Sequence, residues 1–177
     1  MTRLFDFFFS FLGLIILSPL LFLLWIIGLI ENGSPFFTQE RVGYNEKIFL
    51  VVKFRTMKIN TKSVATHLVN QSMITKYGNF LRRTKLDELP QLLNVLKGEM
   101  SLVGPRPCLS NQTELIYERK KRGVFNVRPG ITGLAQLSGI TMETPRLLAD
   151  TDKKMIEKIN LYKYFYYIFK TLFKMLF

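Results

Sequence analysis

Two adjacent carboxylates, Asp87 and Glu88, are the residues of this 177-residue chain whose types and setting most favour chemistry. They follow a basic stretch that contains Arg82, Arg83 and Lys85. One interpretation is structural: Asp87 caps a helix, and Glu88 lies favourably against the helix dipole. The other is catalytic, because a carboxylate nucleophile beside a metal-ligating carboxylate suits attack on a phosphorus whose charge is neutralised by cations. The pair by itself leaves both interpretations open.

Other chemical signatures are missing from the sequence. It has no P-loop, GxGxxG, HExxH or GxSxG motif. The single cysteine, Cys108, excludes an intrachain disulfide framework and a finger-type zinc site. The only histidine, His67, is expected to be an ordinary loop residue, since it has no second histidine or cysteine to share a metal.

The carboxylate pair needs a helix to hold it. Leucines recur after the pair at helical spacing, at positions 89, 92, 93 and 96, which predicts one buried helical face ending at Gly98. Pro90 is tolerated only in the first turn of a helix. The helix should therefore begin close to Asp87 and present both carboxylates at its N-terminus.

A β-hairpin is predicted upstream, with strands at 36–42 and 48–54 around the turn at 43–46. Its second strand should bring Lys53 and Arg55 to one face and Phe54 to the other. The polar stretch at 58–72 is expected to be a mobile loop.

Further elements follow in a chain without repeats or linkers, which indicates one domain. We expect short helices at 74–83 and about 111–122, a brief strand in SLVGPRP, and a strand with the RPGITG turn. The basic residues that end the second helix, Arg119 to Arg122, should complement its dipole in solvent.

The N-terminal residues 7–30 are uncharged and mostly apolar. As a helix this segment is about 36 Å long, enough to cross a hydrocarbon core of about 30 Å. Ser18 and Pro19 lie at its middle, where the proline must bend the helix and the Ser18 hydroxyl is expected to bond the carbonyl of Leu14. A kinked spanning helix and a re-entrant hairpin both fit, and in either case the basic residues that follow place the body in the cytoplasm.

The segment at 161–177 is aromatic on almost every side, with lysines at 163, 170 and 174 in one narrow stripe. This pattern favours a helix lying in the membrane interface, although a core helix with snorkelling lysines has the same pattern. The formal charge of +12 lies entirely beyond residue 30. Such a body requires an anionic partner: nucleic acid, an anionic membrane or a phosphorylated substrate.

Five motifs together resemble one protein family. They are Ser18-Pro19, KFRTM at 53–57, LDELPQL at 86–92, GEMSLVGPRP at 98–107 and RPGITG at 128–133. In this order, over nearly the whole chain, they are similar to the bacterial sugar transferases called monotopic phosphoglycosyl transferases, in their minimal catalytic form.

The resemblance implies an α+β, mostly helical fold with a small β-hairpin and amphipathic interfacial helices. Residues 1–31 would form a re-entrant membrane anchor that breaks at Ser18 and Pro19, and residues 32–177 a membrane-associated catalytic domain. The enzyme would lie on the cytoplasmic face of the bacterial inner membrane, in contact with its lipids.

The implied reaction transfers a sugar phosphate from a UDP-sugar to polyprenyl (undecaprenyl) phosphate and releases UMP. Asp87 would be the nucleophile that carries the sugar phosphate, and Asp87 and Glu88 would hold Mg²⁺. The phosphate-binding cations would be Lys53, Arg55, Arg82, Arg106 and Arg128, and arginine suits such bidentate contacts.

One departure concerns the C-terminal helix, where many relatives have an acidic residue and residues 161–177 have none; we assign no site there. The alternative function is a non-catalytic, membrane-tethered basic module that binds anionic lipid or a glycan-assembly partner. Nucleic acid ranks below both, because no nucleic-acid motif accompanies the charge. The sugar, the pathway, and association with a second copy or with other glycan-assembly enzymes stay open.

Overall fold

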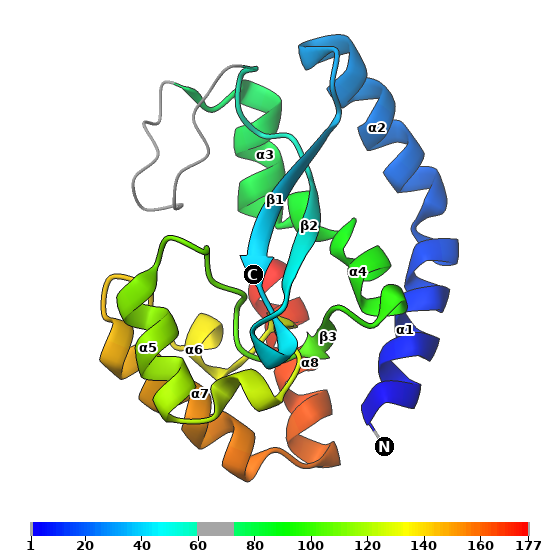
Figure 1. The fold of residues 1–177 in the computed structure, drawn as a ribbon. Helices are drawn as coiled ribbons and strands as arrows, with labels where there is room; N and C mark the ends of the chain where they lie inside the picture. The colour runs from blue at the N-terminus through cyan, green and yellow to red at the C-terminus, as the bar shows by residue number, and fades with distance from the viewer. Residues whose placement is uncertain (1, 60–72, 177) are drawn as a thin grey trace.

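The computed structural model describes residues 2–59 and 73–176. Most of the predicted loop at 58–72, including His67, lies outside these residues. The described chain is mostly helical and has two small two-stranded sheets (Figure 1). The predicted class, mostly helical with a small β-hairpin, is confirmed.

The N-terminal segment forms two helices, α1 (Thr2–Ile16) and α2 (Ser18–Asn32), which meet at an angle of 64°. The bend lies where Pro19, having no N–H, cannot bond the carbonyl of Ile15. The hydroxyl of Ser18 donates to that carbonyl at 2.7 Å. The expected bond to Leu14 is therefore wrong by one residue, because the hydroxyl bonds the carbonyl that the proline leaves without its helical partner.

Neither α1 nor α2 is long and apolar enough to cross a membrane alone, whereas the bent pair passes the same test of length and composition together. The pair runs along one side of the molecule (Figure 1). Its large apolar side chains are exposed along much of both helices: Leu4, Phe7, Phe8, Phe9, Phe11, Ile15, Ile16, Phe22, Leu23, Ile27, Leu29 and Ile30.

The predicted hairpin is confirmed. Strands β1 (Phe36–Val42) and β2 (Ile48–Phe54) pair antiparallel, from Phe36 opposite Phe54 to Val42 opposite Ile48. The short 3₁₀ turn η1 (Tyr44–Glu46) joins them. Phe54 is buried against α2 and α3, and the alternation of the strand leaves Lys53 on the opposite face.

The carboxylate pair lies between two helices, α3 (Lys76–Thr84) and α4 (Gln91–Lys97). Asp87 and Glu88 occupy the 3₁₀ turn η4 (Leu86–Glu88), and α4 begins only after Pro90, so the predicted helix start is several residues too early. Lys85 adopts a left-handed conformation that ends α3 and turns the chain into η4.

The predicted leucine face of α4 is wrong in part, because Leu93 is 43% exposed whereas Asn94 and Val95 are buried. The side chain of Asn94 accepts from the backbone N–H of Val52 and donates to the carbonyl of Leu50. These bonds turn the Asn94 side of α4 toward β2.

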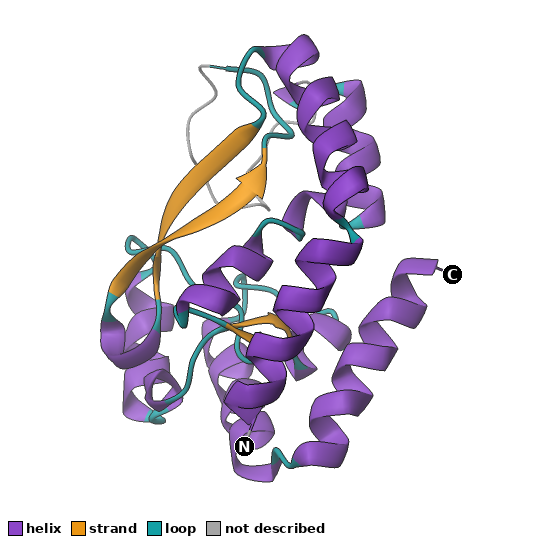
Figure 2. Ribbon diagram, turned by 90° about the vertical axis from the view of Figure 1, so that its right-hand side faces the viewer, coloured by secondary structure: helices purple, strands orange, loops and turns teal. Residues whose placement is uncertain are grey.

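The remaining elements complete the body. They are β3 (Ser101–Val103), α5 (Thr113–Lys121), η5 (Val124–Asn126), β4 (Gly130–Thr132), α6 (Leu134–Leu137), α7 (Pro145–Lys158) and α8 (Leu161–Leu176). Strands β3 and β4 are parallel, and α8 lies beside α1 (Figure 2). Tyr164 and Tyr167 on the inner side of α8 are buried, while Phe169 and Phe173 are exposed.

Candidate active site

A pocket of about 460 Å³ opens between β2, η4, the chain after β3, and α8. Its charged lining residues are Arg41, Lys53, Arg55, Lys58, Arg82, Lys85, Asp87, Glu88 and Arg106. Its apolar lining residues include Leu92, Leu102, Ile131, Leu137, Ile168 and Leu172. The pocket therefore offers charged side chains to an anionic group and apolar side chains to a hydrocarbon group.

Glu88 joins three segments of the chain on the pocket wall. Its Oε1 accepts from Lys53 Nζ of β2 at 3.0 Å and from Arg106 Nη2 at 2.8 Å. Burial alone would raise the pKa of Glu88, but the charges of Arg106 and Lys53 outweigh it and hold the pKa well below its usual range. Glu88 is therefore a permanent carboxylate that holds the two cations in place.

Asp87, its neighbour, has the opposite shift. Burial and the adjacent charge of Glu88 raise the pKa of Asp87 to about 6, although Lys53, Arg82 and Arg106 oppose the rise. A carboxylate that is poorly solvated and still ionised near neutral pH is a stronger nucleophile than an ordinary surface aspartate.

Two further predicted cations lie on the pocket wall. Arg82 donates from Nε to Thr56 Oγ1 at 2.8 Å, and its charge acts on Asp87. Arg55 donates to the carbonyls of Ser34 and Phe36 at the start of β1. The structure thus brings Lys53, Arg82 and Arg106 close to the carboxylate pair and places Arg55 on the same pocket wall.

Arg128 is placed elsewhere. Its Nε donates to the carbonyl of Gly98 at 2.7 Å, and its guanidinium lies over the ring of Tyr44, 5.3 Å from the centroid. It does not contribute to the wall of the pocket. Of the five predicted phosphate-binding residues, Arg128 is the one that does not line the pocket.

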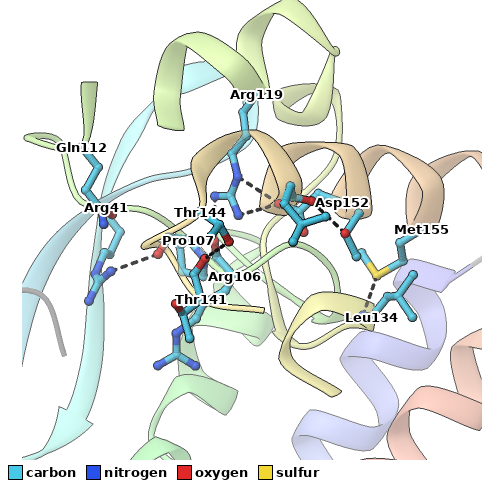
Figure 3. Close-up of polar contacts among 12 residues, drawn as sticks. Arg41, Arg106, Pro107, Gln112, Arg119, Leu134, Thr141, Thr144, Asp152 and Met155 are labelled. Carbon is cyan, nitrogen blue, oxygen red and sulfur yellow. Dashed lines mark hydrogen bonds and ion pairs between the residues drawn. The ribbon is translucent and has the colours of Figure 1, made fainter. Parts of the chain in front are cut away.

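Sequence reasoning missed Arg41, which lies on the same wall. It donates to the carbonyl of Pro107 at 3.0 Å (Figure 3). Burial and the nearby charge of Arg106 lower the pKa of Arg41 to about 10, so it is a cation in crowded positive surroundings. The sequence feature that could have identified it is its position on β1. Arg41 and Gln39 are two residues apart, so they lie on one face of the strand that pairs with the strand of Lys53.

Arg119 was predicted to lie in solvent at the end of α5, and this is wrong. Its side chain is 2% exposed and bonds Asp152 of α7 at 2.7 Å (Figure 3). Its Nη1 also donates to the carbonyl of Arg106 at 2.8 Å. α5 packs against α7, and this contact covers the Arg119 side of the helix. Arg119 therefore supports the backbone of Arg106 from behind the pocket.

The carboxylates on the pocket wall fit a magnesium ion only if a bound substrate supplies further ligands. Within residues 2–59 and 73–176, no group of three or more His, Cys, Asp or Glu side chains could hold a metal ion unaided. Mg²⁺, however, is commonly bound by one or two carboxylates together with substrate phosphates. Lys53 and Arg106 both bond Oε1 of Glu88, and Oε2 accepts neither of these bonds. Asp87 and Glu88 could thus hold Mg²⁺ with a bound phosphate substrate.

The family model described as "Bacterial sugar transferase" matches residues 1–177. The chain belongs to this family. It is 42% identical over 153 residues to the UDP-glucose:undecaprenyl-phosphate glucose-1-phosphate transferase of Escherichia coli, with 83% of this chain and 32% of the relative covered. It is 40% identical over 156 residues to the undecaprenyl-phosphate galactose phosphotransferase of Salmonella typhimurium, with 78% and 33% covered.

A shorter family member gives fuller coverage. The exopolysaccharide production protein PSS of Rhizobium leguminosarum bv. phaseoli is 43% identical over 157 residues, which are 82% of this chain and 78% of the relative. The chain thus spans about a third of the two longer relatives and most of the shorter one.

Proposed function

We propose that this member of the bacterial sugar transferase family moves a sugar phosphate from a UDP-sugar to polyprenyl phosphate and releases UMP. The observation that carries the proposal is the pocket, in which Asp87 lies near Lys53, Arg82 and Arg106 and shares the wall with apolar side chains. The names of the Escherichia coli and Salmonella typhimurium relatives describe the same class of reaction. A non-catalytic basic module would not need such a pocket.

Asp87 is the proposed nucleophile. A carboxylate oxygen of Asp87 attacks the β-phosphorus of the UDP-sugar, and the bond from that phosphorus to the bridging oxygen breaks, with its electron pair leaving on UMP. The sugar phosphate then resides on Asp87 as an acyl phosphate. An oxygen of polyprenyl phosphate attacks the same phosphorus and restores the free carboxylate, so the reaction is ping-pong.

The cations bind and orient the phosphates in this scheme. Lys53 and Arg106, held by Glu88, supply fixed positive charge beside Asp87, and Arg82 and Arg55 extend it along the wall. Fixed charges aimed at the reacting phosphate need no rearrangement during the reaction. Mg²⁺, held by Asp87 and Glu88, would neutralise the diphosphate.

The contacts of the N-terminal helices support a re-entrant arrangement. Arg3, near the start of α1, donates to the carbonyls of Val95 and Leu96, at the end of α4. At the far end of the pair, Glu31 of α2 accepts from Thr75, at the start of α3. Both ends of the bent pair are thus tied to one body, which suits a hairpin that enters and leaves a cytoplasmic membrane face.

The test is the intact mass of the protein after incubation with a UDP-sugar and Mg²⁺ but without acceptor. The expected result is UMP release and an added mass equal to the sugar phosphate, mapping to Asp87. A panel of UDP-sugars would identify the donor in the same assay. UMP release only when polyprenyl phosphate is also present, with unchanged protein mass, would instead indicate direct attack by the lipid phosphate.

Topology is tested separately by cysteine labelling. A cysteine introduced at position 2 and one introduced at Lys58 should react only with a reagent on the cytoplasmic side. Reaction of the position 2 cysteine from the opposite side would show that the bent pair spans the membrane.

A further inference from the structure

The apolar helix α1 carries two charged residues, Arg3 and Asp6, whose charges cancel in the composition. In the structure Asp6 is 2% exposed, and its Oδ1 accepts three hydrogen bonds. The donors are Ser101 Oγ at 2.9 Å, the backbone N–H of Leu102 at 2.9 Å and Tyr164 Oη at 2.8 Å. One carboxylate oxygen therefore joins the N-terminal helix to β3 and to the C-terminal helix α8.

The surroundings of Asp6 make these bonds important. Tyr164 is 1% exposed and packs with Val103, Met155 and Phe5, so water has little access to its hydroxyl. A buried carboxylate is costly unless donors satisfy it, and a hydrogen bond to a charged group contributes more than one between neutral groups. The Asp6–Tyr164 bond is thus a strong link at the base of α8.

Helix α8 extends from the Asp6–Tyr164 bond to the pocket. Ile168 and Thr171 follow Tyr164 by four and seven residues, so all three lie on one helical face. Ile168, Thr171 and Leu172 line the pocket. A hydrogen bond between Thr171 and Thr132 of β4 gives α8 a second attachment, beside the pocket.

We infer that the Asp6–Tyr164 bond holds α8 in place as part of the pocket wall, so that Asp6 and Tyr164 are positioning residues for the hydrocarbon part of the lipid acceptor. The identity of that acceptor rests on the proposed function. The bond lies at the base of α8, and neither Asp6 nor Tyr164 lines the pocket. The residues that α8 contributes to the pocket lining are Ile168, Thr171 and Leu172, none of them charged, so loss of the bond should affect the lipid acceptor and spare the sugar donor.

The test compares Tyr164→Phe with the control Tyr162→Phe in the full chain, reconstituted in phospholipid nanodiscs. Tyr164→Phe keeps the ring and removes the hydroxyl that donates to Asp6, whereas Tyr162 is 77% exposed. For Tyr164→Phe we expect the KM for polyprenyl phosphate to rise about tenfold, the scale of one lost bond to a charged group. UMP release without acceptor should change less than twofold, and the control should match the unmodified chain in both assays.

A second measurement does not depend on activity. Hydrogen exchange of the backbone amides at 165–172 should be about tenfold faster in Tyr164→Phe than in Tyr162→Phe, because the link at the base of α8 is lost. Unchanged exchange, an unchanged KM for the acceptor, or equal losses in both half-reactions would each overturn the inference. If the unmodified chain releases no UMP without acceptor, the covalent route fails, while the exchange measurement still decides the role of the bond.

Discussion

Two groups of charged residues lie on either side of Arg106 and differ in balance. The first, which we call the pocket cluster, consists of Arg41, Lys53, Arg82 and Arg106 with the carboxylates Asp87 and Glu88; Arg41 is buried and the others are half-buried. The second, the core pair, has Arg119 and Asp152, with side chains 2% and 1% exposed and a bond of 2.7 Å. The first group has an excess of positive charge, and the second is neutral.

The difference distinguishes a binding site from a structural support. In a buried pair of opposite charges each partner offsets part of the other's desolvation cost, and removing one partner leaves an uncompensated buried charge. Surplus buried cations have no such compensation, which is why burial and the charge of Arg106 lower the pKa of Arg41 to about 10. The pocket cluster is therefore expected to be stabilised by an anion such as a diphosphate, whereas the core pair is neutral by itself, with Arg119 bonded to Oδ2 of Asp152.

The largest expected effect is the difference between substitution of Asp87 in the pocket cluster and substitution of Asp152 in the core pair. Asp87→Asn should abolish the covalent adduct and lower turnover by about 1,000-fold or more, because it removes the attacking charge, while the protein stays folded. Asp152→Asn should leave Arg119 buried without its charged partner and lower the free energy of unfolding by about 3–5 kcal/mol. Its remaining folded fraction should still form the adduct.

Intact mass and denaturant unfolding of both variants give the comparison. An adduct on Asp87→Asn, or its complete loss in folded Asp152→Asn, would mean that the roles of the two groups have been assigned the wrong way round.

A smaller effect is expected for the cations. Arg106→Ala should lower the rate of UMP release about 100-fold, by analogy with the loss of one preorganised donor at a reacting centre. Arg128→Ala should cost less than about tenfold, since Arg128 bonds Gly98 and is not part of the pocket wall. Single-turnover UMP release measures both. A larger loss for Arg128 would show that it binds substrate in a form of the protein that differs from this one.

The smallest effect concerns pH. Only ionised Asp87 can attack, so UMP release should be constant well above pH 6 and fall about tenfold per unit below the pKa of about 6. The fall reports on Asp87 and not on Glu88, because the charges of Arg106 and Lys53 keep the pKa of Glu88 far lower. Release that stays constant down to pH 4.5, in protein shown to be folded, would contradict the raised pKa.

Much of the local structure was predictable because neighbouring residues decide it. The β-branched and aromatic residues on either side of the turn at 43–46 were sufficient for β1 and β2, and Ser18-Pro19 was sufficient for the break between α1 and α2. The start of α4 was less predictable, because the left-handed Lys85 inserts a 3₁₀ turn before Pro90. Its buried side was not predictable, since it depends on bonds from Asn94 to β2.

For the site, the sequence by itself determined which groups could react: the adjacent Asp87 and Glu88, and the basic motifs that include Lys53, Arg82 and Arg106. Only the tertiary structure decided how these groups are used. Glu88 is bonded to Lys53 and Arg106, residues 35 and 18 positions away, and so it stays ionised while its neighbour Asp87 has a raised pKa. Burial and long-range charge set these differences, and neither depends on spacing along the chain.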